Sequence, residues 1–227
     1  MQISVPDGTF QAHIERPSSE PAPVVVVIQE IFGVNEDLRQ TCREVADAGF
    51  IAIAPDLFWR DEPGLDLNAW SEEEWRRGLE LYQRYDRDRG VEDIRATIAA
   101  ARNLDGASGR VAVMGFCLGG LMTYLTAART DVDVAVEYYG GSTEDYVGEA
   151  DAIKAPMLIH LAGADEFMPP EAQERIRSAV AAKDNIQVFT YDGCSHAFAR
   201  HTGDHYDADA AKLANARTFD FLREKLG

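Results

Sequence analysis

The fold is decided by the stretch Val111-Ala-Val-Met-Gly115-Phe-Cys117-Leu-Gly119-Gly-Leu-Met-Thr-Tyr-Leu125. An apolar run leads into Gly-x-Cys-x-Gly and then into a second apolar run, which predicts a buried strand, a tight turn and a helix. This is the pattern of a nucleophile elbow with cysteine at the reactive position. Gly115 and Gly119 leave room where strand and helix approach closely. We therefore expect the turn to present the thiol of Cys117.

The helix that begins at Leu118 would direct its amides and the positive end of its dipole toward the thiol. Such an environment favours thiolate and can bind a developing oxyanion. Taken alone, the motif is equally typical of a buried cysteine in a glycine-rich turn. The decision between the two depends on partners elsewhere in the chain.

An elbow nucleophile predicts an acid after a later strand. The apolar run 157–161 is followed by the loop 163–170, which contains Asp165 and, beside it, Glu166. A carboxylate in this loop would project from the carboxyl edge of a parallel sheet. Asp165 is the candidate acid, with Glu166 as the neighbour to exclude.

The same pattern predicts a histidine near the end of the chain. His196 follows the apolar run 186–191 and precedes the last predicted helix. A loop histidine is usually a surface residue, and a loop aspartate usually forms a turn or a helix cap. Because both stand in the order nucleophile, acid, histidine, we predict a triad of Cys117, Asp165 and His196.

Short apolar runs alternate with helical periodicity along the whole chain, which is typical of a parallel sheet covered by helices on both faces. Together with the elbow, this predicts an α/β-hydrolase fold with a mostly parallel central sheet. Buried strands are predicted at 24–28, 51–54, 111–114, 132–136 and 157–161. The run 186–190 alternates, which favours a strand nearer an edge, and an antiparallel edge strand is predicted at 10–14. Beside the elbow helix, helices are predicted from 38 to a stop at Gly49, burying Cys42, and at 71–89, 91–103 and about 205–226.

The composition is that of a globular protein, with 46% hydrophobic residues among 227. Because roughly 200–250 residues is ordinary for one α/β domain, we expect a single domain over residues 1–227. No stretch approaches the ~18 apolar residues of a membrane span. The net charge of −17 opposes binding to nucleic acid and to anionic membranes. We expect a small-molecule substrate, no nucleic-acid or membrane partner, and a monomer by default.

Residues 1–10 lack the basic start and apolar run of a secretory signal, so a cytoplasmic location is expected. Cys42, Cys117 and Cys194 form an odd set without the C-x-x-C spacing of zinc or redox sites, which favours reduced thiols. The three histidines near the C-terminus also match no metal-binding spacing. Neither a metal nor another cofactor is expected.

Several segments beyond the elbow closely resemble the dienelactone hydrolase (carboxymethylenebutenolidase) family, whose members use a Cys, His, Asp triad. The run Gln29-Glu-Ile-Phe-Gly-Val-Asn35 is the most family-specific of them. The other matching segments are Ala54-Pro-Asp-Leu57, Gly115-Phe-Cys-Leu-Gly-Gly120, Tyr138-Tyr-Gly140 and His196-Ala-Phe-Ala-Arg200.

The resemblance assigns roles to four further residues. It implies that Glu30 contacts the resting thiol and takes its proton when substrate binds. The backbone amides of Ile31 and Leu118 would form an oxyanion hole. Arg200 would hold a substrate carboxylate. A solvent-facing carboxylate at the end of a strand is the plainer interpretation of Glu30, but its place directly after a buried run puts it at the edge where ligands bind.

One position departs from the family pattern. The second carboxylate-binding arginine of the family falls on Trp75, and Arg76 follows it. A shift of one helical residue turns a side chain by about 100°. Either Arg76 takes over this role, or the pocket is more apolar and accepts a different ester or lactone, which is the interpretation we favour. Phe32 and Tyr139 are further candidates for substrate contact. Packing against the core is the commoner role of a helical tryptophan such as Trp75, and a structural role is the alternative for Tyr139.

We predict a hydrolase that cleaves an activated ester or a dienelactone-like enol lactone to the free acid. The reaction would pass through a thioester on Cys117, with water activated by His196 and Asp165 in the second half. A thioesterase or general carboxylesterase with the same triad is the first alternative. The second is a ligand receptor on the same fold that binds without turnover.

Overall fold

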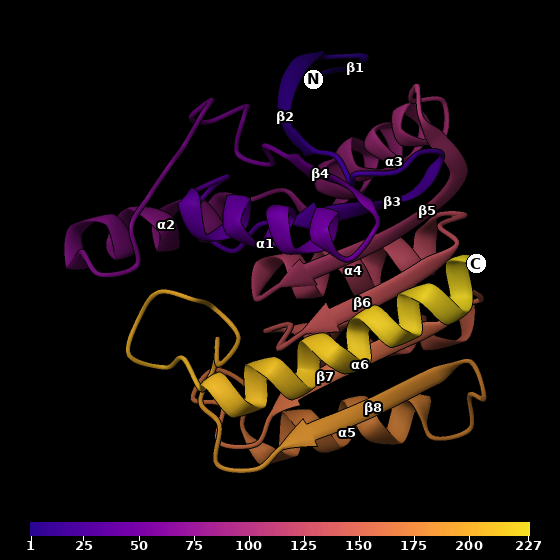
Figure 1. The fold of residues 1–227 in the computed structure, drawn as a ribbon. Helices are drawn as coiled ribbons and strands as arrows, with labels where there is room; N and C mark the ends of the chain where they lie inside the picture. Colours follow the sequence, from indigo (N-terminus) through magenta and orange to yellow (C-terminus); the bar gives the residue numbers. More distant parts are fainter.

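The computed structural model describes residues 1–227 and contains one eight-stranded sheet in the order β1-β2-β4-β3-β5-β6-β7-β8 (Figure 1). The strands are β1 (Gln2–Val5), β2 (Gly8–Glu15), β3 (Ala22–Ile28), β4 (Ile51–Pro55), β5 (Ala107–Phe116), β6 (Val134–Tyr138), β7 (Met157–Ala162) and β8 (Ile186–Tyr191). Strands β3 to β8 run parallel, while β1 and β2 are antiparallel to their neighbours. The predicted parallel sheet and its antiparallel edge are confirmed; β1 was not predicted.

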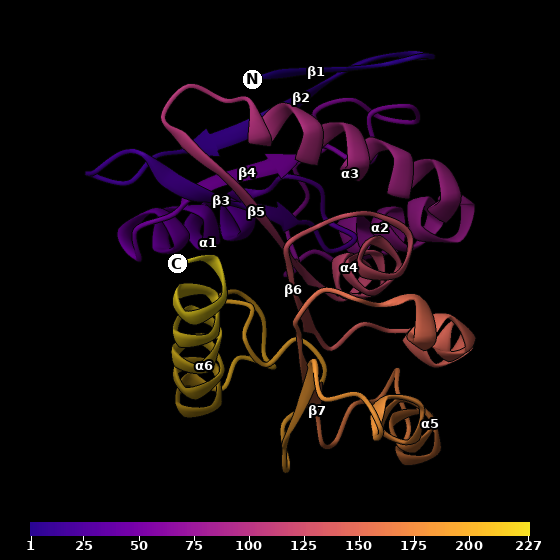
Figure 2. The same cartoon turned by 90° about the vertical axis from the view of Figure 1, so that its right-hand side faces the viewer.

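Helices cover both faces of the sheet, as predicted (Figure 2). The helices are α1 (Glu36–Asp47), α2 (Glu72–Arg84), α3 (Arg87–Arg102), α4 (Leu118–Arg129), α5 (Pro170–Val180) and α6 (Ala208–Leu226), with 3₁₀ turns η1 (Thr143–Asp145) and η2 (Val147–Ala152). Helices α1 and α6 enclose one apolar core, which contains Cys42 as expected. The larger core lies on the opposite face, under α2, α3, α4 and α5.

The boundary between α2 and α3 differs from the prediction, which placed it at Gly90. Helix α2 ends at Arg84 because Tyr85 is extended, and Asp86 then caps α3 by accepting hydrogen bonds from the amides of Asp88 and Arg89. Gly90 lies inside α3, where an added Cβ would stand 2.1 Å from the Tyr85 hydroxyl. This glycine therefore serves close packing and does not break the helix.

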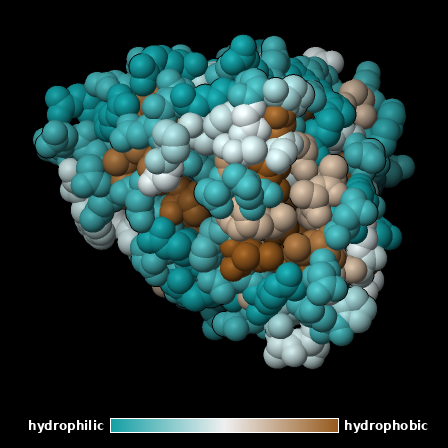
Figure 3. Space-filling model, turned by 90° about the horizontal axis from the view of Figure 1, so that it is seen from above, coloured by the Kyte–Doolittle hydropathy of each residue, from teal (hydrophilic) through white to brown (hydrophobic).

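The surface contains both hydrophilic and apolar areas (Figure 3). On the face drawn in Figure 3, apolar side chains gather toward the middle and hydrophilic ones form the rim. None of the helices combines the length and apolarity needed to cross a membrane.

The elbow is built as the sequence predicts. Strand β5 ends at Phe116, α4 begins at Leu118, and Cys117 between them has φ 55° and ψ −114°. A Cβ on Gly115 would lie 2.0 Å from the carbonyl oxygen of Gly119, and one on Gly119 would lie 2.3 Å from that of Ile28. Both glycines are therefore required by the contact of α4 with the ends of β5 and β3.

Gly119→Ala is expected to lower the free energy of unfolding by about 1–3 kcal/mol or more, because a methyl group there meets rigid backbone. The urea unfolding midpoint measures this change. Gly148→Ala is the control, because its added Cβ would have no atom within 4 Å. Equal midpoints for the two variants would show that α4 does not need its close approach to β3.

Candidate active site

A cavity of about 260 Å³ lies at the carboxyl ends of the parallel strands. Such an edge is where open α/β sheets bind ligands. It combines the predicted thiol and imidazole with mostly apolar side chains. The lining residues are Glu30, Ile31, Phe32, Trp75, Leu79, Tyr82, Cys117, Gly141, Ser142, Phe167, His196 and Arg200.

The imidazole of His196 is buried and fixed from one side. Its Nδ1 lies 2.8 Å from Oδ2 of Asp165, while Nε2 is buried without a hydrogen-bond partner. Burial of the ring opposes protonation, but the charge of the neighbouring Cys117 and the bond to Asp165 outweigh it. The pKa of His196 is therefore raised well above its ordinary value, which favours an imidazolium beside the sulfur.

The two adjacent carboxylates after β7 have different contacts. Asp165 accepts from the ring of His196 through Oδ2, and from the amides of Phe167 and Met168 through Oδ1. Glu166 instead accepts from the backbone amide of His196 at 3.1 Å. The ring is thus oriented by Asp165, whereas Glu166 holds only the main chain of the histidine loop.

Glu30 and Arg200 form an ion pair in the wall of the cavity. Nη1 of Arg200 donates to Oε2 of Glu30 at 3.2 Å, and both side chains are buried. Nε of Arg200 donates to the carbonyl of Thr202. Oε1 of Glu30 is buried without a partner, and no hydrogen bond joins Glu30 to Cys117. In this arrangement the carboxylate is paired with the guanidinium and not with the thiol.

Gln29 places Glu30 and was not singled out from the sequence. Its buried side chain accepts from the amide of Leu57 after β4 and donates to the carbonyl of Glu30. This pins the end of β3 to the neighbouring strand end. A polar residue inside an otherwise apolar strand end was the available signal.

Two backbone amides near the elbow are free to donate. The amide of Ile31 makes no backbone hydrogen bond, and Leu118, as the first residue of α4, has no acceptor one turn earlier. The close contact of Gly119 with the carbonyls of Ile28 and Gln29 brings the two segments together. The two amides that the family resemblance assigns to an oxyanion hole thus have no backbone acceptor.

The remaining candidate residues separate into two groups. Trp75 and Phe32 line the cavity and contact each other edge to face, with ring centroids 5.6 Å apart. Tyr139 does not line it; this residue is fully buried, and its ring packs edge to face on His196 at 5.2 Å. Arg76 is exposed and also lies outside the lining. The helix thus turns Trp75, and not Arg76, toward the cavity.

Five lining residues were missed in the sequence: Leu79, Tyr82, Gly141, Ser142 and Phe167. The first two could have been found, because they lie four and seven residues after Trp75 and share its face of the helix. The other three lie on loops, whose course periodicity does not predict.

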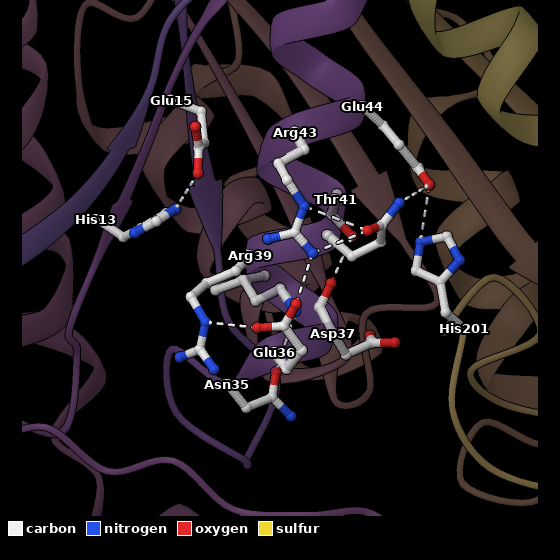
Figure 4. Close-up of polar contacts among 12 residues, drawn as sticks. His13, Glu15, Asn35, Glu36, Asp37, Arg39, Thr41, Arg43, Glu44 and His201 are labelled. Atoms are coloured by element: carbon white, nitrogen blue, oxygen red, sulfur yellow. Dashed lines mark hydrogen bonds and ion pairs between the residues drawn. The ribbon is translucent and has the colours of Figure 1, made fainter.

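Helix α1 contacts the loop that follows Arg200, and Figure 4 shows Glu44 of this helix facing His201. Glu44 of α1 lies 3.3 Å from Nε2 of His201, and a carboxylate oxygen of Asp37 accepts from the amide of Thr202 at 3.1 Å. Burial, reinforced by the negative charge of Glu30, raises the pKa of Asp37 to about 6. The two residues that follow Arg200 in the chain are therefore both held by α1.

Comparison with known proteins identifies the family of this chain. The model of the dienelactone hydrolase family matches residues 10–226. A candidate carboxymethylenebutenolidase of Azospirillum brasilense is 41% identical over 99% of both chains. The carboxymethylenebutenolidase of Pseudomonas putida is 40% identical over 95% of this chain and 92% of its own.

A crystal structure of a candidate dienelactone hydrolase from Klebsiella pneumoniae subsp. pneumoniae superposes with a TM-score of 0.85. It is 28% identical and covers 99% of this chain and 98% of its own. The predicted α/β-hydrolase fold is confirmed by this likeness and by the sheet.

The raised pKa of Asp37 predicts a pH dependence of stability. The folded chain holds a proton on Asp37 up to about pH 6, whereas the unfolded chain loses it near 3.8, so ionisation lowers stability as the pH rises through this window. Asp37→Asn should therefore raise the free energy of unfolding at pH 7 by on the order of 1–2 kcal/mol, a value reduced to allow for the partial exposure of Asp37. Urea unfolding at pH 4, 5, 6 and 7 measures it.

The control is Glu36→Gln in the same helical turn, where the carboxylate is exposed and paired with Arg43. Between pH 5 and 7, its free energy of unfolding should change with pH in the same way as that of the unchanged protein. If the free energy of unfolding of Asp37→Asn shows the same pH dependence as that of the unchanged protein, Asp37 does not hold a proton in the folded state.

Proposed function

Because the chain belongs to the dienelactone hydrolase family and is a hydrolase of that family, we propose that it cleaves activated esters or enol lactones through a thioester on Cys117. The supporting observation is that Cys117 and His196 line one cavity, with Asp165 bonded to the far nitrogen of the imidazole. These three residues would then serve as nucleophile, base and orienting acid in an acyl transfer.

The first step is formation of the thiolate. His196 takes the thiol proton on Nε2, and Asp165 stabilises the resulting imidazolium through Nδ1. The raised pKa of His196 supports this step, because the imidazole beside a negative sulfur holds its proton more tightly. Glu30 offers a second acceptor, since its Oε1 has no partner inside the protein.

The thiolate then attacks the substrate carbonyl carbon, and the carbonyl electrons move to oxygen. The amides of Ile31 and Leu118 would donate to this oxyanion, and the positive end of the α4 dipole adds to their effect. Removing one donor of this kind typically slows a reaction about 10²- to 10³-fold.

Collapse of the tetrahedral intermediate breaks the acyl carbon to oxygen bond. The leaving oxygen takes the proton from His196; in a lactone it stays tethered to the acyl group. Water then gives a proton to His196 and attacks the thioester carbon. The carbon to sulfur bond breaks, the free acid leaves, and the sulfur takes back a proton from His196. Arg200 would bind an acidic or polar end of the substrate during both steps.

Cys117→Ala should abolish turnover, and Asp165→Asn should lower kcat/KM about 10²- to 10⁴-fold, because the imidazole loses its orientation and charge partner. Steady-state hydrolysis of an enol lactone, a thioester and a simple aryl ester measures this. Cys194→Ala is the matched control, because Cys194 is buried and does not line the cavity.

Unchanged turnover in Cys117→Ala would refute the proposal. Binding of all three substrates without acid release, in the unchanged protein, would assign the cavity to a receptor. Rapid cleavage of the thioester alone would make the chain a thioesterase.

A further inference from the structure

One wall of the cavity is aromatic, and it extends to the imidazole, since the rings of Phe167 and His196 lie edge to face with centroids 5.0 Å apart. Trp75 and Phe167 are stacked, with centroids 6.2 Å apart and planes 22° apart, and Phe32 meets Trp75 edge to face. Leu79 and Tyr82 continue this surface along the same face of α2. Two elements distant in the sequence, α2 and the loop after β7, thus present flat apolar surfaces to one space.

These side chains are more exposed than core packing requires. Phe167 is 50% exposed and Leu79 is 37% exposed, although both belong to an otherwise strongly acidic chain. Exposed aromatic side chains that border a cavity are available to a ligand, which would bury area that water now covers.

Each cationic group that lines the cavity already has an anionic partner inside the protein. Arg200 is paired with Glu30, and His196 is paired with Asp165. Arg77 on α2 is paired with Glu62 at 2.6 Å, and Arg76 lies outside the lining. An anionic group placed against Trp75 would therefore lose its hydration without gaining a partner.

One polar contact is available there. The hydroxyls of Tyr82 and Ser142 lie 3.2 Å apart, and either can donate to a ligand in place of the other. This pair suits an uncharged oxygen substituent and gives no charge compensation.

We propose that the substrate carries a flat, uncharged aromatic group that packs against Trp75 and Phe167, while its ester or lactone carbonyl reaches Cys117. Trp75 is then the residue that selects for this group. The proposal rests on the proposed function, since it names the substrate class of that site. It predicts that a carboxylate on the aromatic group is rejected.

Three enol lactones that differ only in the exocyclic group test this: 5-benzylidene-, 5-(4-carboxybenzylidene)- and 5-methylene-2(5H)-furanone. The benzylidene lactone should have a kcat/KM at least about 10-fold above that of its carboxylated form. Trp75→Ala should lower kcat/KM for the benzylidene lactone about 10-fold, mainly through KM, because one stacking contact is lost. The methylene lactone carries no ring to stack on Trp75, so Trp75→Ala should lower its kcat/KM much less than that of the benzylidene lactone. Trp75→Phe should retain most of the preference.

Trp70→Ala is the matched control, because Trp70 is 60% exposed just before α2 and does not line the cavity. Methylene-lactone turnover also reports whether the Trp75 variants fold. Equal loss on both neutral lactones, no loss, or a preference for the carboxylated lactone would overturn the inference. Failure of the unchanged protein to cleave any lactone would instead refute the proposed function.

Discussion

The backbone at Cys117, with φ 55° and ψ −114°, is a conformation that residues with a side chain rarely adopt, and packing on both sides holds it there. Strand β5 fixes the chain before the turn, and α4 lies so close to the ends of β5 and β3 that only glycine fits at 115 and 119. The position of the thiol is therefore a property of the whole sheet. Every other group of the site is placed relative to this one sulfur.

Three other non-glycine residues have positive φ, namely Tyr139, Ser142 and Ala197, and all stand at the same edge of the sheet. Ala197 follows His196, Ser142 lines the cavity, and Tyr139 packs on the imidazole. Strained backbone of this kind persists only where surrounding structure determines it. Here the buried ends of β5, β6 and β7 and the hydrogen bonds of Asp165 hold the backbone in these conformations.

Much of this could be predicted from the sequence, because its signals are local. The elbow needs glycine at fixed positions, and the strands are short apolar runs, so both stand out in the printed sequence. The break at Tyr85 was misplaced because Gly90, a common helix breaker, here serves packing against Tyr85. Phe167 and the contact of Asp37 with Thr202 depend on the path of loops across many residues, which no local pattern reveals. The pairing of Glu30 with Arg200 is likewise a tertiary result.

The most direct test is the intact mass of the protein after rapid mixing with an enol lactone and quenching in acid, followed by peptide mapping. Both the unchanged protein and Asp165→Asn, in which hydrolysis of the thioester is slowed, would be sampled. The account predicts a mass increase equal to the whole lactone, on the peptide that contains Cys117, because ring opening leaves no separate product. An adduct on a different residue, or acid release while Cys117 stays free at all quench times in both proteins, would contradict it.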